Sequence, residues 1–527
     1  MTAAEAVPQA SSWKPKANPW AIVIVVTIAA FMEILDTTIV NVSLPHIAGS
    51  LSASNDEATW ALTSYLLANG VVLTISGWLS SLIGRKRYFV ICIVMFTVAS
   101  FLCGIANSLA QLVFFRLLQG FFGGGMQPSQ QSIILDTFPP EKRGAAFGVT
   151  AIATIVAPVL GPTLGGYITD TYNWRWIFFA NLPVGVVAVF FISLLVEDPP
   201  WLKRRGLGDI DYIGLALITL GLGCLQVGLD RGQNEDWLAS PFIRWMMTFA
   251  ALGIFGAIAW LLIAKRPVVD LHVFKDRNFA VACLCMSATG GVLYAGAVVI
   301  PQFTQTQLGY DATWSGLVLS PGAMLIIFMI PMVGKLLNVV QTRLLIFTGF
   351  VLMGLAFLYS AQLYLGLDFK SLVIFRTSQT IGLAFLFVPI STIAFANVPR
   401  ELNGDATALF VMLRNVFGSI GISIASSLIL RRAQVHQAYL SEWADPERGA
   451  FKALVDTHQH ALIAMGRTAS AAHSEAMGKA YQVFAQQAEV LGYGDVFLLA
   501  SLVTFFVAPF CFLFTPRKGG GGPGGAH

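Results

Sequence analysis

Charged residues are scarce in this sequence. Asp, Glu, Lys and Arg make up only 11% of its 527 residues, whereas soluble domains carry about 25% charged residues. Hydrophobic residues make up 56%, and the mean hydropathy is +0.71. Water cannot be the main solvent of such a chain. The composition therefore excludes an ordinary soluble domain and predicts an integral membrane protein.

The sequence also lacks the motifs of disulfide, metal and catalytic sites. It has no HExxH, GxSxG or phosphate-cradling loop, and its seven histidines lie in loops or at helix ends. We therefore expect no cofactor and no metal, and a membrane-embedded enzyme is a distant alternative. The net charge of +4 comes from residues at helix ends, so no nucleic-acid partner is expected. All six cysteines fall in apolar stretches: Cys92, Cys103, Cys224, Cys283, Cys285 and Cys511.

Long hydrophobic runs fill most of the chain. A bilayer core about 30 Å thick needs roughly 20 apolar residues per helix, and fourteen runs are long enough. The first follows the polar residues 1–18, and the others begin near Trp60, Tyr88, Leu109, Ala145, Ile177, Ile210, Ile243, Phe279, Trp314, Leu344, Ser371, Ala406 and Tyr493. We predict an all-α membrane protein with fourteen transmembrane helices, whose even number places both termini on one side.

The positions of the basic residues indicate which side of the membrane holds the two termini. They cluster after the even-numbered runs, whereas the opposite short loops carry almost none. Because Lys and Arg accumulate in cytoplasmic loops, both termini should be cytoplasmic. The clusters are Arg85-Lys86-Arg87, Lys142-Arg143, Lys203-Arg204-Arg205, Lys265-Arg266, Arg343, Arg400 and Arg517-Lys518.

Internal repetition divides the chain into halves. Arg116-x-x-Gln119 recurs as Arg376-x-x-Gln379, at a spacing of 260 residues. Other matches in the same order at nearly the same spacing indicate duplication, which is common in transporters and favours alternating access over a channel.

The repeat predicts the following parts. Residues 1–18 form a cytoplasmic tail, 19–200 a six-helix bundle, 201–270 a linker with helices 7 and 8, and 271–516 a second six-helix bundle. Residues 431–492 form a long periplasmic loop in which short helices are expected near 451–460 and 471–491. The Gly-rich residues 517–527 form a disordered cytoplasmic tail.

Two acids lie inside the first run. Glu33 and Asp36 share one helix face, about 20 to 24 Å along the helix from Trp20. A carboxylate at that depth costs roughly 2.5 to 3.5 kcal/mol unless it has a partner, a cavity or a proton. We predict proton coupling by Asp36 and Glu33, with Arg116 of the fourth run as the partner. The alternatives are a structural ion pair and an arginine that braces backbone carbonyls.

Other polar side chains inside the runs are candidates for a substrate cavity, although they could instead bond between helices. They are Asn41, Tyr65, Asn69, Gln119, Gln127 and Gln379.

A glycine-rich segment ends the second run. It reads Gly77-Trp-Leu-Ser-Ser-Leu-Ile-Gly84-Arg85 and continues into a basic turn. This segment resembles the signature of the major facilitator superfamily between helices 2 and 3. Ser81 and Leu82 stand where that family usually has an acid and a base. We therefore do not expect the family's charged latch at these two positions.

The fifth run has two prolines and several glycines. Pro158, Gly161, Pro162, Gly165 and Gly166 predict a kinked helix with a small-residue face. The motif resembles the superfamily's antiporter signature Gly-Pro-x-x-Gly-Gly, which implies export instead of uptake.

Three further motifs narrow the resemblance. The stretches at residues 35–45, 63–69 and 174–185, together with fourteen spans, resemble the EmrB/QacA-type drug:proton antiporters over nearly the whole chain. This implies the major facilitator fold, with two inserted helices, and proton-coupled efflux of amphipathic drugs across a bacterial inner membrane. It also implies a periplasmic adaptor protein and an outer-membrane channel as partners. An exporter of one metabolite, such as a siderophore or a fatty acid, is the alternative.

Overall fold

The computed structural model describes residues 15–200, 211–337, 339–441 and 449–515. Within these ranges the regular structure consists of helices alone. Residues 1–14, the cluster Lys203-Arg204-Arg205, and the tail with Arg517-Lys518 lie outside the described residues.

The helices cross the molecule in fourteen passes. Thirteen helical segments in the described ranges are each long and apolar enough to span a membrane, and α5 with α6 makes the fourth pass in two pieces. The protein is therefore a multi-pass membrane protein. The passes are α1 (Pro19–Ser50), α3 (Trp60–Ile83), α4 (Arg85–Gly104), α5 (Leu109–Gly123) with α6 (Met126–Thr137), α7 (Pro140–Thr171), α8 (Trp176–Phe179) with α9 (Asn181–Leu195), α10 (Tyr212–Arg231), α11 (Pro241–Ile263), α12 (Arg277–Thr306), α13 (Ala312–Leu336), α14 (Thr342–Ser360), α15 (Phe369–Ala394), α16 (Asn403–Ser441) and α18 (Ala469–Val507).

The fourth pass is broken because two glycines let neighbouring helices come very close. A Cβ at Gly124 would lie 2.5 Å from the carbonyl oxygen of Asn69, and one at Gly125 would lie 2.3 Å from the Tyr88 hydroxyl. Adjacent glycines also weaken a helix. The fourth run predicted from the sequence is thus two helices, which place Gln127 at the start of α6.

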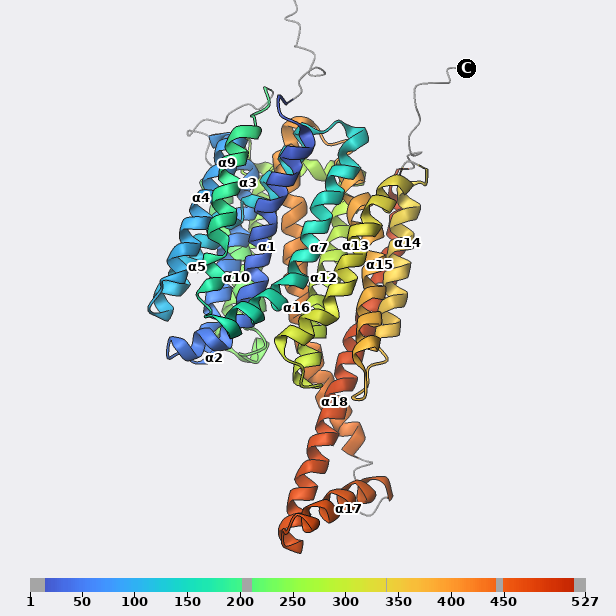
Figure 1. The fold of residues 1–527 in the computed structure, drawn as a ribbon. Coiled ribbons are helices and arrows are strands. Elements are labelled where there is room, and N and C mark those ends of the chain that lie inside the picture. The colour runs from blue at the N-terminus through green and yellow to red at the C-terminus, as the bar shows by residue number, and fades with distance from the viewer. Residues whose placement is uncertain (1–14, 201–210, 338, 442–448, 516–527) are drawn as a thin grey trace, which may run out of the picture.

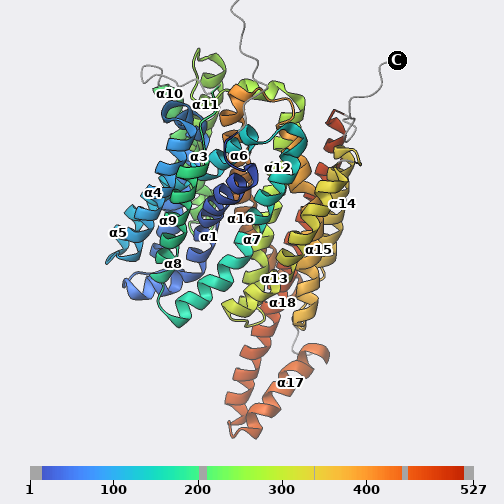
Figure 2. The same cartoon turned by 45° about the horizontal axis from the view of Figure 1, so that its top comes forward.

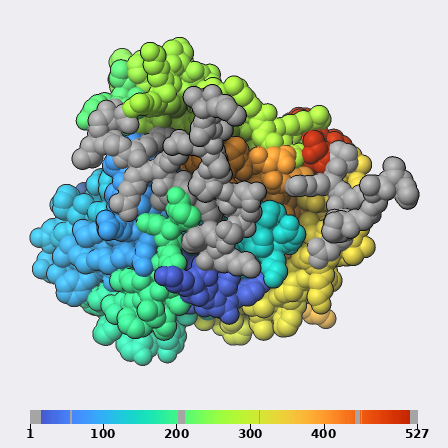
Figure 3. Space-filling model, turned by 90° about the horizontal axis from the view of Figure 1, so that it is seen from above, coloured from blue at the N-terminus to red at the C-terminus, as the bar shows by residue number. Residues whose placement is uncertain are grey.

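Two groups of helices stand side by side (Figure 1). Helices α1 to α9 form the first group and α12 to α18 the second. They meet where α7 packs on α13 and α3 packs on α16. Helices α10 and α11 pack on each other, with α10 resting on α3, and the light green α11 lies at one edge of the molecule (Figures 2 and 3). The predicted boundaries at 19–200, 201–270 and 271–516 stay predictions.

The groups are joined tightly at the end of the molecule from which both chain termini leave, which we call the terminal face (Figure 1). A Cβ at Gly77 of α3 would lie only 2.7 Å from Gly404 of α16. Nearby, the hydroxyls of Ser132 and Thr407 are 2.8 Å apart. These contacts close the terminal face.

A charged contact strengthens this end, although Ser81 and Leu82 replace the family's acid and base. The buried Arg85 forms an ion pair with the buried Asp136 of α6. The glycine-rich turn therefore does have an ionic partner, but it comes from the fourth pass. The sequence did not reveal it because the partner follows 51 residues later, near the end of the second piece of the fourth pass.

The opposite end carries a helical projection (Figure 1). Helix α16 continues to Ser441, α17 (Gly449–Ala464) turns back, and α18 runs unbroken from Ala469 into the last pass. The segment 431–492 is thus largely helical, and its second helix is continuous with a span because nothing between them breaks it. Helix α17 packs on α18 through a small apolar cluster of Val455, Leu462, Ala472, Ala476 and Ala480.

Replacing Gly77 by Leu should separate α3 from α16 at the terminal face, because Gly404 leaves no room for a side chain. Spin labels at the exposed positions Arg87 and Glu401 would report the separation by electron spin resonance, in a Cys224→Ser background that removes the one incompletely buried cysteine among those described. We expect a longer label distance in Gly77→Leu. Gly334→Leu is the control, since nothing lies within 4 Å of a Cβ there. Equal distances in both variants would refute the proposed contact.

Candidate functional site

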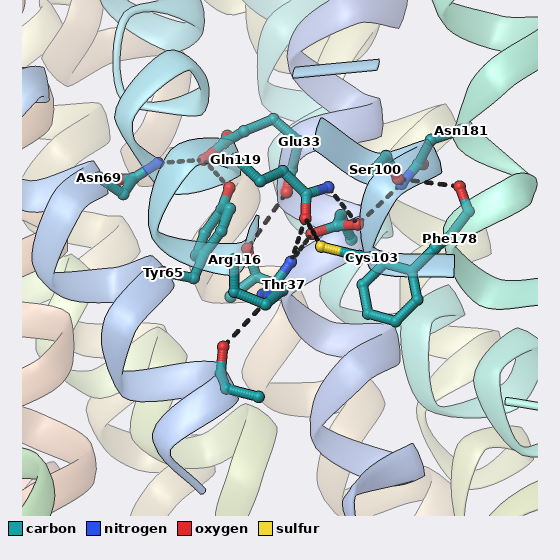
Figure 4. A network of polar contacts seen from close by, with 12 residues as sticks. Glu33, Thr37, Tyr65, Asn69, Ser100, Cys103, Arg116, Gln119, Phe178 and Asn181 are labelled. Carbon is teal, nitrogen blue, oxygen red and sulfur yellow. Dashed lines mark hydrogen bonds and ion pairs between the residues drawn. The ribbon is translucent and has the colours of Figure 1, made fainter. Parts of the chain in front are cut away.

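Two carboxyl groups lie in the middle of α1. Asp36 is about 25 Å along the helix from Pro19, near the centre of a helix of 32 residues. Asp36 is 2% exposed and Glu33 3%. An unpaired carboxylate in such a place is costly, because both the membrane and the packed helices exclude water. The surrounding side chains offset that cost by bonding to the two carboxylates, and they form two distinct polar centres (Figure 4).

The first centre is built around Asp36. Arg116 of α5 forms an ion pair with it, with Nη1 2.6 Å from Oδ2. Gln119 and Asn181 donate to Oδ1 from 3.0 and 2.7 Å. Two helices, α5 and α9, thus place three donors on one carboxylate of α1, and an ionised Asp36 is fully satisfied.

Arg116 is itself held in place. Its Nε donates to the carbonyl oxygen of Ala61 at 3.1 Å, and its Nη1 also donates to Gln119 at 2.8 Å. The guanidinium carbon lies 4.1 Å from the centre of the Tyr65 ring, a cation–π contact. Both of the predicted arrangements therefore occur together: Arg116 pairs with an acid and also bonds a backbone carbonyl.

The second centre surrounds Glu33. Tyr65 Oη, Asn69 Nδ2 and Gln127 Nε2 donate to its carboxylate at 3.2, 2.9 and 2.6 Å. Tyr65 contacts both centres, because its hydroxyl bonds Glu33 and its ring lies against Arg116. Tyr65 of α3 therefore links Glu33 to the arginine that pairs with Asp36.

A residue of the other helix group joins the Glu33 centre. Arg414 of α16 donates a hydrogen bond to Gln127, whose amide nitrogen donates to Glu33. Arg414 is 1% exposed. The sequence analysis missed it, although an arginine inside the apolar run that begins near Ala406 was a usable signal.

Helix α7 presses its small residues against α1 beside Asp36. A Cβ at Gly161 would lie 2.0 Å from the Thr38 hydroxyl, and one at Gly165 would lie 3.1 Å from the Ile39 carbonyl oxygen. Pro158, Pro162 and Gly166 are buried on the same helix. Thr163 of α7 packs against Gly316 of α13 in the other group. Thus α7 touches the acid-bearing helix on one side and the second group on the other.

The candidate cavity residues lie in three different places. Tyr65, Asn69, Gln119 and Gln127 are hydrogen-bond partners of the two acids, as described above. Asn41 is exposed on α1 and belongs to neither centre. Gln379 lies in the second group, where it donates to Ser360 at 2.9 Å. Asn181, whose amide contacts Asp36, was not among the predicted site residues even though it lies in one of the quoted motifs.

Comparisons with known proteins give a consistent result. The sequence model of the Major Facilitator Superfamily matches residues 26–422. The chain is 34% identical to the multidrug export protein EmrB of Escherichia coli over 96% of this chain and 97% of that protein. It is 35% identical to the fatty acid resistance protein FarB of Neisseria gonorrhoeae over 94% and 96%. A structure of the proton:xylose symporter XylE shares the fold, with a TM-score of 0.56 at 13% identity over 93% and 95%.

Replacing Arg116 by Gln should destabilise the fold by about 3 to 5 kcal/mol, because it leaves the Asp36 carboxylate buried without its cation. The double variant Asp36→Asn/Arg116→Gln should recover most of that loss. The free energy of unfolding can be measured by titration with SDS. Arg376→Gln is the matched control, since it removes a buried arginine without leaving a carboxylate behind. An equal loss in the two single variants would contradict the assigned pair.

Proposed function

The chain belongs to the major facilitator superfamily, and on this premise we propose that it exports amphipathic, largely apolar compounds in exchange for protons. It is a secondary active transporter and not an enzyme. The observation that carries the proposal is the buried Asp36, held by Arg116 at the middle of the membrane-spanning helices. The multidrug export relatives and the antiporter-like α7 support export over uptake.

Proton binding at Asp36 would drive the cycle. A proton arriving from outside neutralises the carboxylate and removes the charge that holds Arg116. Helix α1 is then free to shift against the small-residue face of α7, and α7 transmits the shift to α13 in the other group. The two groups rock around α7–α13 and α3–α16, which exposes the substrate site to alternate sides. Each proton moving inward contributes about 2.3 kcal/mol per 100 mV of membrane potential, so no cofactor is needed.

The Glu33 centre is the proposed link between substrate and proton. It lies one helical turn from Asp36, shares Tyr65 with the first centre, and is tied through Gln127 to Arg414 in the second group. A substrate that displaces Arg414 or Gln127 would disturb Glu33 and, through Tyr65, Arg116. Binding on one side can therefore alter proton release from Asp36.

The charge pattern supports a proposed orientation. Arg85, Arg143, Arg343 and Arg400 lie at the ends of helices toward the terminal face, and basic loops are retained in the cytoplasm. We assign the terminal face to the cytoplasm and the helical projection to the periplasm of a bacterium, with the chain in the inner membrane.

The projection is the proposed contact for a periplasmic adaptor that leads to an outer-membrane channel. Helix α17 and the first half of α18 extend past the other helices and pack on each other through their own apolar cluster. A preformed projection presents a defined surface at little entropic cost on binding.

A single-metabolite exporter is the second candidate. It is favoured by the similarity to FarB, a fatty acid resistance protein, and it would use the same proton machinery. A panel of substrates, and not the geometry of Asp36, distinguishes it from multidrug export.

Asp36→Asn should abolish substrate-induced proton release while leaving the protein in the membrane, because an amide fills the same space and cannot carry the proton. The measurement is a pH-sensitive dye in inverted vesicles, with a panel of apolar cationic and neutral drugs. Asp170→Asn is the control, since Asp170 is an exposed acid of the same helix group. Normal proton release by Asp36→Asn would contradict the assignment of Asp36 as the proton-binding residue.

Replacing residues 442–468 with a Gly-Ser linker of equal length should remove adaptor capture, because it deletes α17 but keeps the spanning helices. Co-purification of the intact and altered proteins with the adaptor, each scored against its membrane content, measures the effect. Equal capture of the adaptor by the two forms would contradict the proposed contact and would mean that the projection is only a passive lid.

A further inference from the structure

Part of the Asp36 centre is duplicated in the second helix group. The centre also includes Ser100, whose hydroxyl accepts a hydrogen bond from the Asn181 amide at 3.0 Å. Three polar residues of the centre recur at a spacing of 260: Ser100 as Ser360, Arg116 as Arg376, and Gln119 as Gln379. The serines lie on α4 and α14, and the other two pairs lie on α5 and α15. The second group therefore carries the same polar residues on corresponding helices.

The duplicated residues also make corresponding contacts. Arg376 Nη1 donates to Gln379 Oε1 at 3.1 Å, as Arg116 Nη1 does to Gln119 at 2.8 Å. Gln379 Nε2 then donates to the Ser360 hydroxyl at 2.9 Å. In the first group, the amide of Gln119 donates instead to Asp36.

The carboxylate is what the second group lacks. Gly296 of α12, 260 residues after Asp36, faces the duplicated arginine. A Cβ there would lie 3.3 Å from Arg376 Nη1 and 3.7 Å from Gln379 Oε1. Arg376 is 4% exposed, its Nε is buried without a hydrogen-bond partner, and no Asp or Glu of the described ranges forms an ion pair with it. A buried guanidinium in this state is costly, and a ligand anion would offset that cost.

An apolar cavity adjoins the arginine. Ser360 of the polar cluster lines it, as does Phe375, the residue next to Arg376. Ile300, one helical turn from Gly296 and on the same face of α12, lines it too. Phe303 and Phe497 complete its apolar lining. In this conformation the cavity has a volume of only about 10 Å³, room for about one water molecule, so an alkyl chain enters only if these side chains move.

We propose that Arg376, Gln379 and Gly296 form a binding site for the carboxylate of an amphipathic organic acid, whose apolar part extends toward the cavity of Ile300 and Phe375. The proposal rests on the export function proposed above and names one class of its substrates. The first helix group shows what the shared arrangement holds, since there an arginine and a glutamine bind a carboxylate. Arginine pairs well with carboxylates, and a cationic ligand would be repelled.

The test uses calorimetric titration of the purified full-length protein in lipid nanodiscs with octanoate, its neutral analogue octanamide, and chloride. Gly296→Asp installs the missing carboxylate beside Arg376, and Gly296→Ala adds the Cβ without the charge. We expect Gly296→Asp and Arg376→Gln to bind octanoate at least about tenfold more weakly than the unaltered protein, because an ion pair to the ligand is lost. Gly296→Ala should stay within about threefold, and octanamide should bind as weakly as octanoate binds to Gly296→Asp.

Each other outcome counts against the site. Equal octanoate affinity in the unaltered protein and in Gly296→Asp would overturn it, even if Arg376→Gln fails to fold. Displacement of octanoate by an equal concentration of chloride would show a site for small inorganic anions only, which also contradicts the proposal. Proton release induced by cationic drugs in the unaltered protein tests the export function separately, because that assay requires no anionic ligand.

Discussion

A charge pair buried among apolar helices is the constraint on which the structure depends. Asp36 and Arg116 sit where neither lipid nor water can solvate them, so their partners must come from the protein. The surrounding helices are arranged accordingly: α5 supplies the cation, α9 and α5 supply amide donors, and α3 supplies an aromatic ring and a backbone carbonyl. In the proposed cycle, a proton on Asp36 would unbalance all of these contacts at once and allow the helices to shift.

Contacts through the other helices link that pair to the interface between the two helix groups. Helix α7 contacts α1 within two residues of Asp36 through Gly161, and it contacts the other group through Thr163. The terminal face is closed by contacts between α3 and α16, and Arg85 pairs with Asp136 inside the first group beside it. The chain of contacts from carboxylate to interface therefore runs through small residues, which permit sliding without large rearrangement of side chains.

Much of this could be predicted from sequence, because membrane insertion leaves a strong pattern. The apolar runs indicate the passes, and charged residues inside runs are rare enough that Asp36, Glu33 and Arg116 were obvious. The residues that bond to these charged side chains were harder to predict. Asn181 and Gln127 look like ordinary polar residues until the fold brings them to the acids. Arg85 likewise meets Asp136, 51 residues further along the sequence, only in the folded chain. Asn41, a polar residue inside a run, joins neither centre, and its assignment to a substrate cavity stays a prediction.

The most direct test of the central claim is infrared difference spectroscopy of the purified protein on addition of an exported drug at constant pH. The proposed exchange predicts the loss of a protonated-carboxyl band with a matching gain of carboxylate signal, and the absence of that change in Asp36→Asn. An unchanged carboxyl region in the unaltered protein, or the same change in Asp36→Asn, would contradict the claim that drug and proton compete through Asp36.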